Sequence, residues 1–304
     1  MVEDIASVAR PPLGIRYEVS GGAMLLHQSG TGRPPVVFLA GGGMSGRYYW
    51  NVHNLVAAFT TSVSYDRLGL GWSDAVDLPR SGTQVTDDLH ELLRVAAVPG
   101  PYVLVGHSLG GLYARLYAKR FPGEVAGLVL LDPTHEDVVA YLPEKAAARL
   151  RDWNTDDLFP FEQLEAMRKM YRTTFGRALA DWPAEIREPL LDQGFSSEGY
   201  RQSLREPMNL PYVFGEVRDA GPDPDVPVIF VSAMGSDAFA EELVPPEARK
   251  SAAESNEARH RLYTDLAAAL PRAEVRRLDD VGHSGIAWFR PDAVVQAVRD
   301  TFSR

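Results

Sequence analysis

The sequence predicts an α/β fold with a mostly parallel central sheet flanked by helices and a helical cap inserted after the sixth strand. Three observations lead to this prediction. Short, almost wholly apolar segments alternate with segments of helical periodicity, which is typical of buried parallel strands covered by helices. A serine between two glycines joins one apolar segment to a helical one. The alternation stops over 134–225 and then resumes.

Six strands are expected before the insertion. Two short segments of strand character flank Gly21-Gly22 and predict a hairpin. The helix expected over 84–97 follows from apolar residues spaced three or four apart. The predicted strands are 14–20, 23–28, 36–40, 61–65, 103–105 and 125–131, and the predicted helices are 51–59, 84–97 and 112–118.

The insertion is expected to be a separate helical layer. Its segments do not match the apolar strands on either side of it, and it is far longer than the roughly 2–6 residues of an ordinary connection. We therefore assign 1–133 and 226–304 to the core and 134–225 to a cap. The core is expected to resume with strands at 228–231 and 274–278 and helices at 254–270 and 292–302.

The segment Gly106-His107-Ser108-Leu109-Gly110-Gly111 carries the strongest functional signal. It lies between a predicted strand and a predicted helix, as does the Gly-x-Ser-x-Gly turn that presents a nucleophilic serine. Side chains at Gly106 and Gly110 would collide with neighbouring backbone in so tight a turn. The turn also places the serine at a helix N-terminus, whose amides favour developing negative charge. We predict that Ser108 is the nucleophile.

A serine nucleophile needs a base and a carboxylate that orients the base, in the chain order serine, acid, histidine. His283 lies in a glycine-flanked loop after the last predicted strand, where an open α/β sheet places its chemistry. Asp237 and Asp132 both follow strands and fit the order. We favour Asp237 as the acid. Asp132 is the alternative, and it could instead hold the elbow loop or the cap entrance.

Two backbone amides must face the oxyanion of the tetrahedral intermediate. Leu109 is expected to supply one, because it directly follows the nucleophile. The other is expected from the glycine loop after strand 36–40, at Gly42, with Gly43 as the alternative. Four further side chains are expected near the substrate, namely Met44, His107, His135 and Met234.

These segments together resemble the α/β-hydrolase superfamily from about Val36 to the C-terminus. Residues 65–74, YDRLGLGWSD, resemble its Asp-x-x-Gly-x-Gly-x-Ser segment, and Leu-Leu-Asp-Pro at 130–133 and Gly282-His283 resemble its strand ends. Members carry the second oxyanion donor just after a His-Gly pair. Ala40-Gly41 takes that place here, so the resemblance also points to Gly42.

The sequence departs from some branches of that superfamily. Ser108 occupies the elbow position at which epoxide hydrolases and haloalkane dehalogenases carry a nucleophilic aspartate. Met44 follows Gly43, so the His-Gly-Gly-Pro-Gly pattern of proline iminopeptidases is absent. Asp66 and Arg67 are expected to form structural hydrogen bonds or an ion pair beneath the site.

Composition narrows the classes of partner. The 304 residues are 45% hydrophobic and 24% charged, as in soluble globular proteins. A net charge of −10 argues against a nucleic-acid partner, and the lack of cysteine excludes disulfides and cysteine-ligated metals. An acidic N-terminus and the absence of a run of roughly 18 apolar residues predict a cytoplasmic protein without a membrane partner. The oligomeric state is left open.

Two other patterns compete with the serine elbow. Residues 41–46 match Gly-x-Gly-x-x-Gly after a strand, and Asp66 lies 20 residues beyond Gly46, which mimics a dinucleotide-binding fingerprint. This interpretation leaves the elbow and His283 unexplained. Four residues that could suggest a metal, Asp87, Asp88, His90 and Glu91, are more simply explained by the dipole of the helix that begins there.

The sequence thus predicts a serine hydrolase that needs no cofactor or metal and cleaves a carboxylic ester or lactone through an acyl-enzyme. The aromatic-rich cap favours a hydrophobic small molecule as substrate. One alternative is a non-hydrolytic enzyme on the same scaffold, such as a cyclase, acyltransferase or carbon–carbon lyase. Another is a nucleotide-binding or ligand-binding protein.

Overall fold

Eight strands form one sheet in the computed structural model, which describes residues 13–151, 161–236 and 246–304. Their order is β1-β2-β4-β3-β5-β6-β7-β8. The pairs β1–β2 and β2–β4 are antiparallel, and the others are parallel. Every predicted strand is present, so the α/β fold class is confirmed. The strands are β1 (Ile15–Val19), β2 (Gly22–Ser29), β3 (Val36–Leu39), β4 (Ser62–Tyr65), β5 (Tyr102–His107), β6 (Val125–Leu131), β7 (Val228–Ala233) and β8 (Ala273–Leu278).

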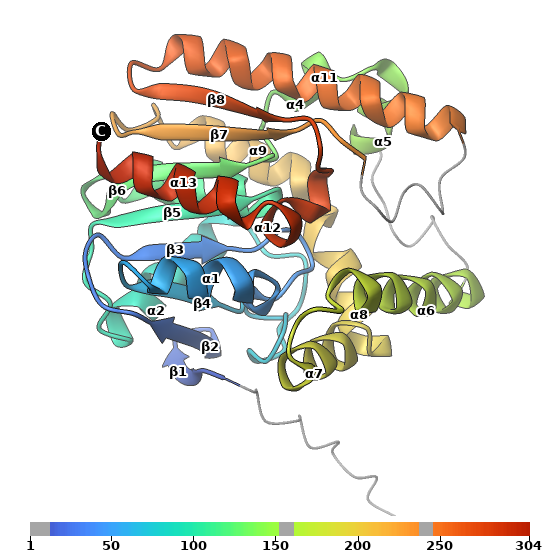
Figure 1. Ribbon diagram of the computed structural model, residues 1–304, viewed down its shortest axis with the longest axis horizontal. Helices are drawn as coiled ribbons and strands as arrows, with labels where there is room; N and C mark the ends of the chain where they lie inside the picture. The colour runs from blue at the N-terminus through green and yellow to red at the C-terminus, as the bar shows by residue number, and fades with distance from the viewer. Residues whose placement is uncertain (1–12, 152–160, 237–245) are drawn as a thin grey trace, which may run out of the picture.

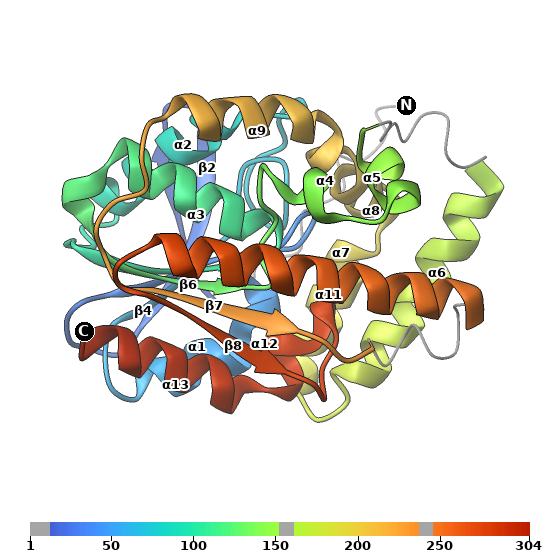
Figure 2. The same cartoon turned by 90° about the horizontal axis from the view of Figure 1, so that it is seen from above.

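Helices cover both faces of this sheet (Figures 1 and 2). One face carries α1 (Trp50–Ala57), α12 (Ile286–Phe289) and α13 (Pro291–Phe302). The other carries α2 (Gly82–Val95), α3 (Leu109–Arg120), α9 (Leu210–Asp219) and α11 (Pro246–Ala269). The helix predicted over 254–270 begins earlier than expected, because Pro246 occupies its first position, where proline suits a helix.

The central strands of the sheet are buried on both sides. In β3, Val36 and Phe38 belong to the apolar core on one face, and Val37 and Leu39 belong to the core on the other. All four are fully buried. Successive strand residues point to opposite faces, so a strand covered on both sides is apolar at most of its positions. This explains why continuous apolar segments predicted the strands.

The described part of the insertion is helical. It contains α4 (Val138–Tyr141), α5 (Glu144–Arg151), α6 (Phe161–Ala178), α7 (Ala184–Gly194), α8 (Ser197–Arg205) and a 3-10 turn, η3 (Glu206–Asn209). In Figure 1, α6, α7 and α8 stand apart from the sheet. They share a small apolar core built on Leu191, Phe195 and Tyr200. By contrast, α9 packs against α2 and α3 and so joins the helical layer of the core.

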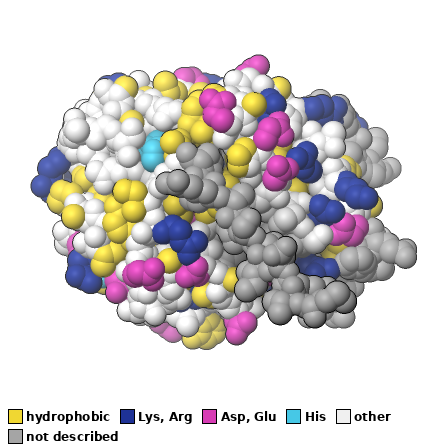
Figure 3. Space-filling view, turned by 90° about the horizontal axis from the view of Figure 1, so that it is seen from below, with side chains coloured by type: hydrophobic (Ala, Val, Ile, Leu, Met, Phe, Trp, Pro, Cys, Tyr) yellow, Lys and Arg dark blue, Asp and Glu magenta, His cyan; other side chains and the backbone are white. Residues whose placement is uncertain are grey.

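The surface is mixed in character. On the face seen in Figure 3, acidic, basic and apolar side chains are interspersed, without one large patch of a single charge. Among the helices that the structure describes, none is both long and apolar enough to span a membrane.

Three histidines are buried by the fold, a fourth, His27, is partly buried, and all four are held neutral. Burial is the main cause in each, and it lowers the pKa of His27 to about 4 and those of His53, His107 and His135 to about 3. The His27 and His53 rings lie 4.6 Å apart, and the charge of Arg47 adds to the effect on both. Each of these side chains resists protonation in the folded protein.

We expect the free energy of unfolding to decrease as the pH falls from about 6.5 towards 5. In the unfolded chain these histidines take up protons near pH 6.5, whereas in the folded protein they do so only near pH 3–4. The unfolded state therefore binds more protons in this interval. Each fully buried histidine then costs up to about 1.4 kcal/mol of stability per pH unit.

Urea unfolding at several pH values between about 7.5 and 5.5 measures this effect. His53→Gln replaces one buried histidine by a neutral amide, and this variant should show a smaller pH dependence than the wild type. A free energy of unfolding that stays constant over the interval would contradict the interpretation.

Candidate active site

Ser108 is placed by the turn between β5 and α3. Its φ of 51° and ψ of −121° are strained for a residue with a side chain, at a cost of roughly 1–3 kcal/mol. Neighbouring backbone holds the turn in place. The Ser108 amide donates to Leu131 O at 3.1 Å, and the Thr134 amide donates to Ser108 O at 2.9 Å.

The two glycines of the elbow are required by close approach. A Cβ at Gly106 would lie 2.5 Å from the oxygen of Gly110. A Cβ at Gly110 would lie 2.1 Å from the oxygen of Leu39 in the neighbouring strand. Both distances are shorter than any real contact allows, so the steric reason inferred from the sequence holds at both positions.

His283 faces the carboxylate of Asp132. Its Nδ1 lies 2.6 Å from Asp132 Oδ2. Because an ionised carboxylate only accepts hydrogen bonds, Nδ1 carries the proton and Nε2 is left with a lone pair. This is the form of histidine that can take a proton from a hydroxyl group.

This pairing bears on the choice of acid and favours the alternative, Asp132. The sequence favoured Asp237, which lies outside the described residues, and ranked Asp132 second. The structure gives His283 the Asp132 carboxylate as its partner. The reason is topological, because Asp132 directly follows β6, which lies beside the elbow strand β5. Its amide also donates to Val231 O at 2.7 Å, which anchors the residue to β7.

Asp132 remains ionised although it is buried. Burial alone would raise its pKa, but Arg259 and the hydrogen bond to His283 outweigh burial and lower the pKa to about 2. Arg259 Nη2 lies 3.2 Å from Asp132 Oδ2, and the hydroxyl of Tyr263 lies 3.3 Å from Asp132 Oδ1. The sequence gave no signal for Arg259 or Tyr263, because both lie on α11 and far from any motif.

The glycine loop after β3 leaves one amide available. The Gly41 amide donates to Tyr49 Oη at 3.3 Å, and the Gly43 amide donates to Glu206 Oε2 at 2.6 Å. Within the described residues, the Gly42 amide makes no such bond. A Cβ on Gly42 would lie 3.4 Å from Leu109 Cδ2. Gly42 is therefore a neighbour of Leu109, and the alternative donor Gly43 is already occupied.

A cavity of about 450 Å³ opens beside this group of residues, a size typical of small-molecule sites. Ser108, Asp132 and His283 all line it. The side chains that α11 contributes to its wall include Asn256 and Arg259. Apolar side chains from α4, α5 and α9 also line it, namely Val138, Leu142, Leu150 and Leu210.

Only part of the predicted substrate contacts lies at this cavity. Met234 lines it, whereas the described lining residues do not include Met44, His107 or His135. A substrate contact by those three stays a prediction, which the lining of this cavity does not support. Met44 packs against the core, and the two histidines are buried.

His107 instead connects two loops of the site. Its Nε2 donates to His283 O at 2.8 Å, and its Nδ1 accepts from Tyr49 Oη at 2.7 Å. Burial, together with the charge of His283, keeps its pKa at about 3, so the ring is neutral and one nitrogen can accept. The chain of bonds from the Gly41 amide through Tyr49 and His107 thus holds the glycine loop and the His283 loop together.

The residues of the competing dinucleotide-binding pattern have structural roles inside the fold. The amides of Gly46 and Trp72 donate to Asp66 at 2.8 and 2.9 Å, and Asp66 is buried. Its carboxylate therefore cannot bind a ribose. A Cβ on Gly46 would lie 2.4 Å from Tyr65 O, so this glycine serves close packing of the chain.

The acidic residues expected at the start of a helix lie beyond the first turn of α2, which contains no acidic residue, so the helix dipole does not explain them. They are paired within the protein instead. Asp88 bonds Arg80, Asp87 bonds Arg120 at 2.8 Å, and His90 bonds Glu124 at 3.0 Å. Glu91 accepts from the Ser20 amide at 2.8 Å. Each of the four residues that could suggest a metal site therefore has its own partner within the protein.

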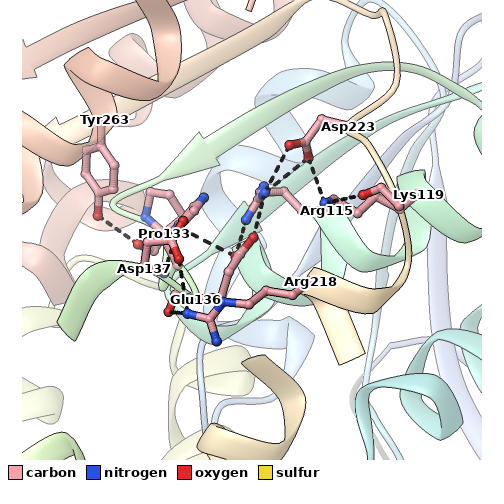
Figure 4. A network of polar contacts seen from close by, with 10 residues as sticks. Arg115, Lys119, Pro133, Glu136, Asp137, Arg218, Asp223 and Tyr263 are labelled. Atoms are coloured by element: carbon pink, nitrogen blue, oxygen red, sulfur yellow. Dashed lines mark hydrogen bonds and ion pairs between the residues drawn. The ribbon is translucent and has the colours of Figure 1, made fainter. Parts of the chain in front are cut away.

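Arg115 of α3 joins the two ends of the insertion (Figure 4). It bonds Glu136, just after β6, and Asp223, just before β7. Although His135, Glu136 and Asp137 bring possible metal ligands within 4.8 Å of one another, Arg115 already occupies the Glu136 carboxylate. This arrangement suits a structural hinge better than a cation.

Known proteins match the chain over most of its length. A family model described as the alpha/beta hydrolase family matches residues 36–297. The uncharacterized protein YqjL of Bacillus subtilis is 31% identical over 132 residues, which are 42% of this chain and 52% of YqjL. The chain spans about half the length, or less, of the curated relatives it matches.

Solved structures agree in fold. Cfl2 from Burkholderia cenocepacia superposes with a TM-score of 0.71 at 21% identity, covering 95% of each chain. The enol-lactonase from Burkholderia xenovorans LB400 superposes with a TM-score of 0.62 at 19% identity, covering 95% of this chain and 100% of that one.

Proposed function

Since the chain belongs to the alpha/beta hydrolase family, we propose that it is a serine hydrolase that cleaves a carboxylic ester or lactone of a hydrophobic small molecule. The observation that carries this proposal is the meeting of three residues at one cavity: Ser108 on its strained turn, His283, and the buried Asp132 bonded to His283. Their roles are those of nucleophile, base and orienting acid.

Acylation begins when Ser108 Oγ attacks the acyl carbonyl. His283 Nε2 takes the hydroxyl proton, and the Asp132 carboxylate stabilises the imidazolium that results. The carbonyl oxygen becomes an oxyanion that accepts hydrogen bonds from the Gly42 and Leu109 amides. The tetrahedral intermediate then collapses. Its bond to the leaving oxygen breaks, and His283 returns the proton to that oxygen.

Deacylation repeats the steps of acylation with water as the nucleophile. His283 removes a proton from water, the hydroxide attacks the ester carbonyl on Ser108, and the same two amides hold the oxyanion. Collapse releases the carboxylic acid and returns the proton to Ser108. With a lactone, the leaving alcohol is part of the acyl group and departs with it after this second step.

The cavity supports an apolar acyl or alcohol group. Its apolar lining comes from α4, α5 and α9, and burying such surface gives about 25 cal/mol per Å². A structural neighbour of similar fold is described as an enol-lactonase, which supports a lactone as one candidate substrate. Cleavage of an ester or lactone also needs no catalytic group beyond the nucleophile, base, acid and two oxyanion donors named above.

Covalent labelling tests the proposal. A fluorophosphonate should inactivate the wild-type protein and add one phosphonyl group, which proteolysis and mass spectrometry should locate on Ser108. Ser108→Ala should remain unlabelled under the same conditions. A wild-type protein that resists the reagent would instead favour a ligand-binding role.

Product analysis separates hydrolysis from transfer. With a p-nitrophenyl ester in water, the acid should account for all the nitrophenol released. If an added alcohol captured nearly all the acyl group while water gave almost no acid, the protein would be an acyltransferase.

A further inference from the structure

We propose that Glu206 of the cap acts with Arg67 as a positioning pair that orients the Gly42 amide. The oxyanion hole would then be complete only while η3 is docked on the glycine loop. The inference rests on the proposed function for its chemical meaning, and on five hydrogen bonds of Arg67 and Glu206 for its geometry.

Arg67 and Glu206 form a buried, two-pronged ion pair. Arg67 Nε donates to Glu206 Oε1 at 2.5 Å, and Nη2 donates to Oε2 at 2.9 Å. Only 4% and 5% of the two side chains are exposed. Burial alone would lower the pKa of Arg67, but Glu206 raises it above its ordinary value. The pair is thus a fixed charge-assisted contact between core and cap.

Both members of the pair also hold the backbone of the glycine loop. Arg67 Nη1 donates to Ala40 O and Nη2 to Gly41 O, each at 2.7 Å. Glu206 Oε2 accepts from the Gly43 amide at 2.6 Å. The peptide units on both sides of Gly42 are therefore held by this one ion pair.

The bond to Gly41 O determines the direction of the Gly42 amide. The Gly41 carbonyl and the Gly42 N–H belong to the same planar peptide unit, and in a trans peptide they point in opposite directions. With the carbonyl held against Arg67, the N–H must point away from the ion pair. The peptide cannot rotate without breaking a charged hydrogen bond.

The cap approaches the loop closely at this point. A Cβ on Gly43 would lie 2.5 Å from Ser203 Cβ, and Gly43 has a φ of 69°. Ser203 belongs to α8 and Glu206 begins η3. Because the carboxylate comes from the cap, undocking of this part of the cap would leave Arg67 without its partner and the Gly43 amide without its acceptor.

Comparison of Glu206→Gln with Glu216→Gln tests the inference. Glu216 is the matched control, because it too follows the cap helices and accepts two backbone amides of the core. Those amides belong to Gly82 and Thr83 at the start of α2, at 2.7 and 3.0 Å, rather than to the glycine loop. Four quantities are measured in each variant: kcat and KM for a p-nitrophenyl ester, the rate of fluorophosphonate labelling, and hydrogen exchange of peptides covering 40–46.

Glu206→Gln should lower kcat and the labelling rate by about 10-fold to 100-fold, a large part of what removal of an oxyanion donor costs. KM should change less than about twofold, since binding of the ground state does not use the Gly42 amide. Exchange over 40–46 should be faster. Glu216→Gln should keep the wild-type kcat and the wild-type exchange of this loop.

Arg67→Lys provides a second test of the inference if Glu206→Gln fails to fold. Lysine keeps the charge beside Glu206, but one ammonium cannot reproduce the planar fork that reaches both carbonyls, so kcat should fall while the protein stays folded.

Wild-type kcat in folded Glu206→Gln or Arg67→Lys would overturn the inference. If the wild-type protein itself neither turns over nor labels, the proposed function fails. Unchanged exchange over 40–46 in Glu206→Gln would then separately overturn the positioning role.

Discussion

Ser108→Ala should lower kcat for a p-nitrophenyl ester by on the order of 10⁵-fold or more. The substitution removes the only atom that forms the acyl bond, and loss of the nucleophile costs about 10⁶-fold in kcat in well-studied serine hydrolases. The cavity keeps its walls, so binding of a substrate or product analogue should change little. Steady-state kinetics, together with calorimetric titration of the product acid, measure both quantities.

Ser45→Ala is a suitable control for that experiment. Ser45 is buried near the glycine loop, and its hydroxyl has no hydrogen-bond partner among the described residues. Its removal should therefore leave kcat unchanged. Ser108→Ala with full activity would exclude the proposed mechanism, and equal losses in the two variants would point to a structural effect.

Asp132→Asn should reduce the rate of acylation by about 10³-fold to 10⁴-fold. An asparagine can donate its amide hydrogens to His283 Nδ1, which stabilises the wrong tautomer, with the proton on Nε2, where the base is needed. The negative charge that stabilises the imidazolium is lost as well. Single-turnover release of nitrophenol with enzyme in excess measures acylation directly.

Asp237→Asn is the matched variant, because Asp237 was the acid that the sequence favoured. We expect it to acylate at close to the wild-type rate. Loss of acylation in Asp237→Asn together with its retention in Asp132→Asn would reverse the assignment. Asp132→Asn should also be less stable, because Arg259 then lacks the carboxylate that it contacts at 3.2 Å.

Those parts of the fold that follow from local chemistry were predictable from sequence. The central strands are buried on both faces, so their apolar segments are unmistakable, and the elbow glycines are required by contacts of 2.5 Å or less. The early start of α11 was missed, because residues 246–253 are mainly alanine and polar and show no apolar periodicity.

The partner of His283 and the Arg67–Glu206 ion pair depend on long-range contacts that the sequence does not reveal. Choosing between Asp132 and Asp237 requires knowing that β6 lies beside β5 in the sheet, which is a property of strand order. Arg67 was expected to make structural bonds beneath the site. Its partner Glu206 lies 139 residues away and is brought to it by the cap. Long-range pairs of this kind leave no local pattern.

The acyl-enzyme on Ser108 is tested most directly by the mass of the intact protein quenched during turnover of a p-nitrophenyl ester. We predict that wild-type protein gains one acyl group, that this group maps to Ser108, and that Ser108→Ala gains none. Asp132→Asn should acquire the same group much more slowly. Turnover by a protein whose mass never changes under rapid quenching, or an acyl group on another residue, would exclude Ser108 as the nucleophile.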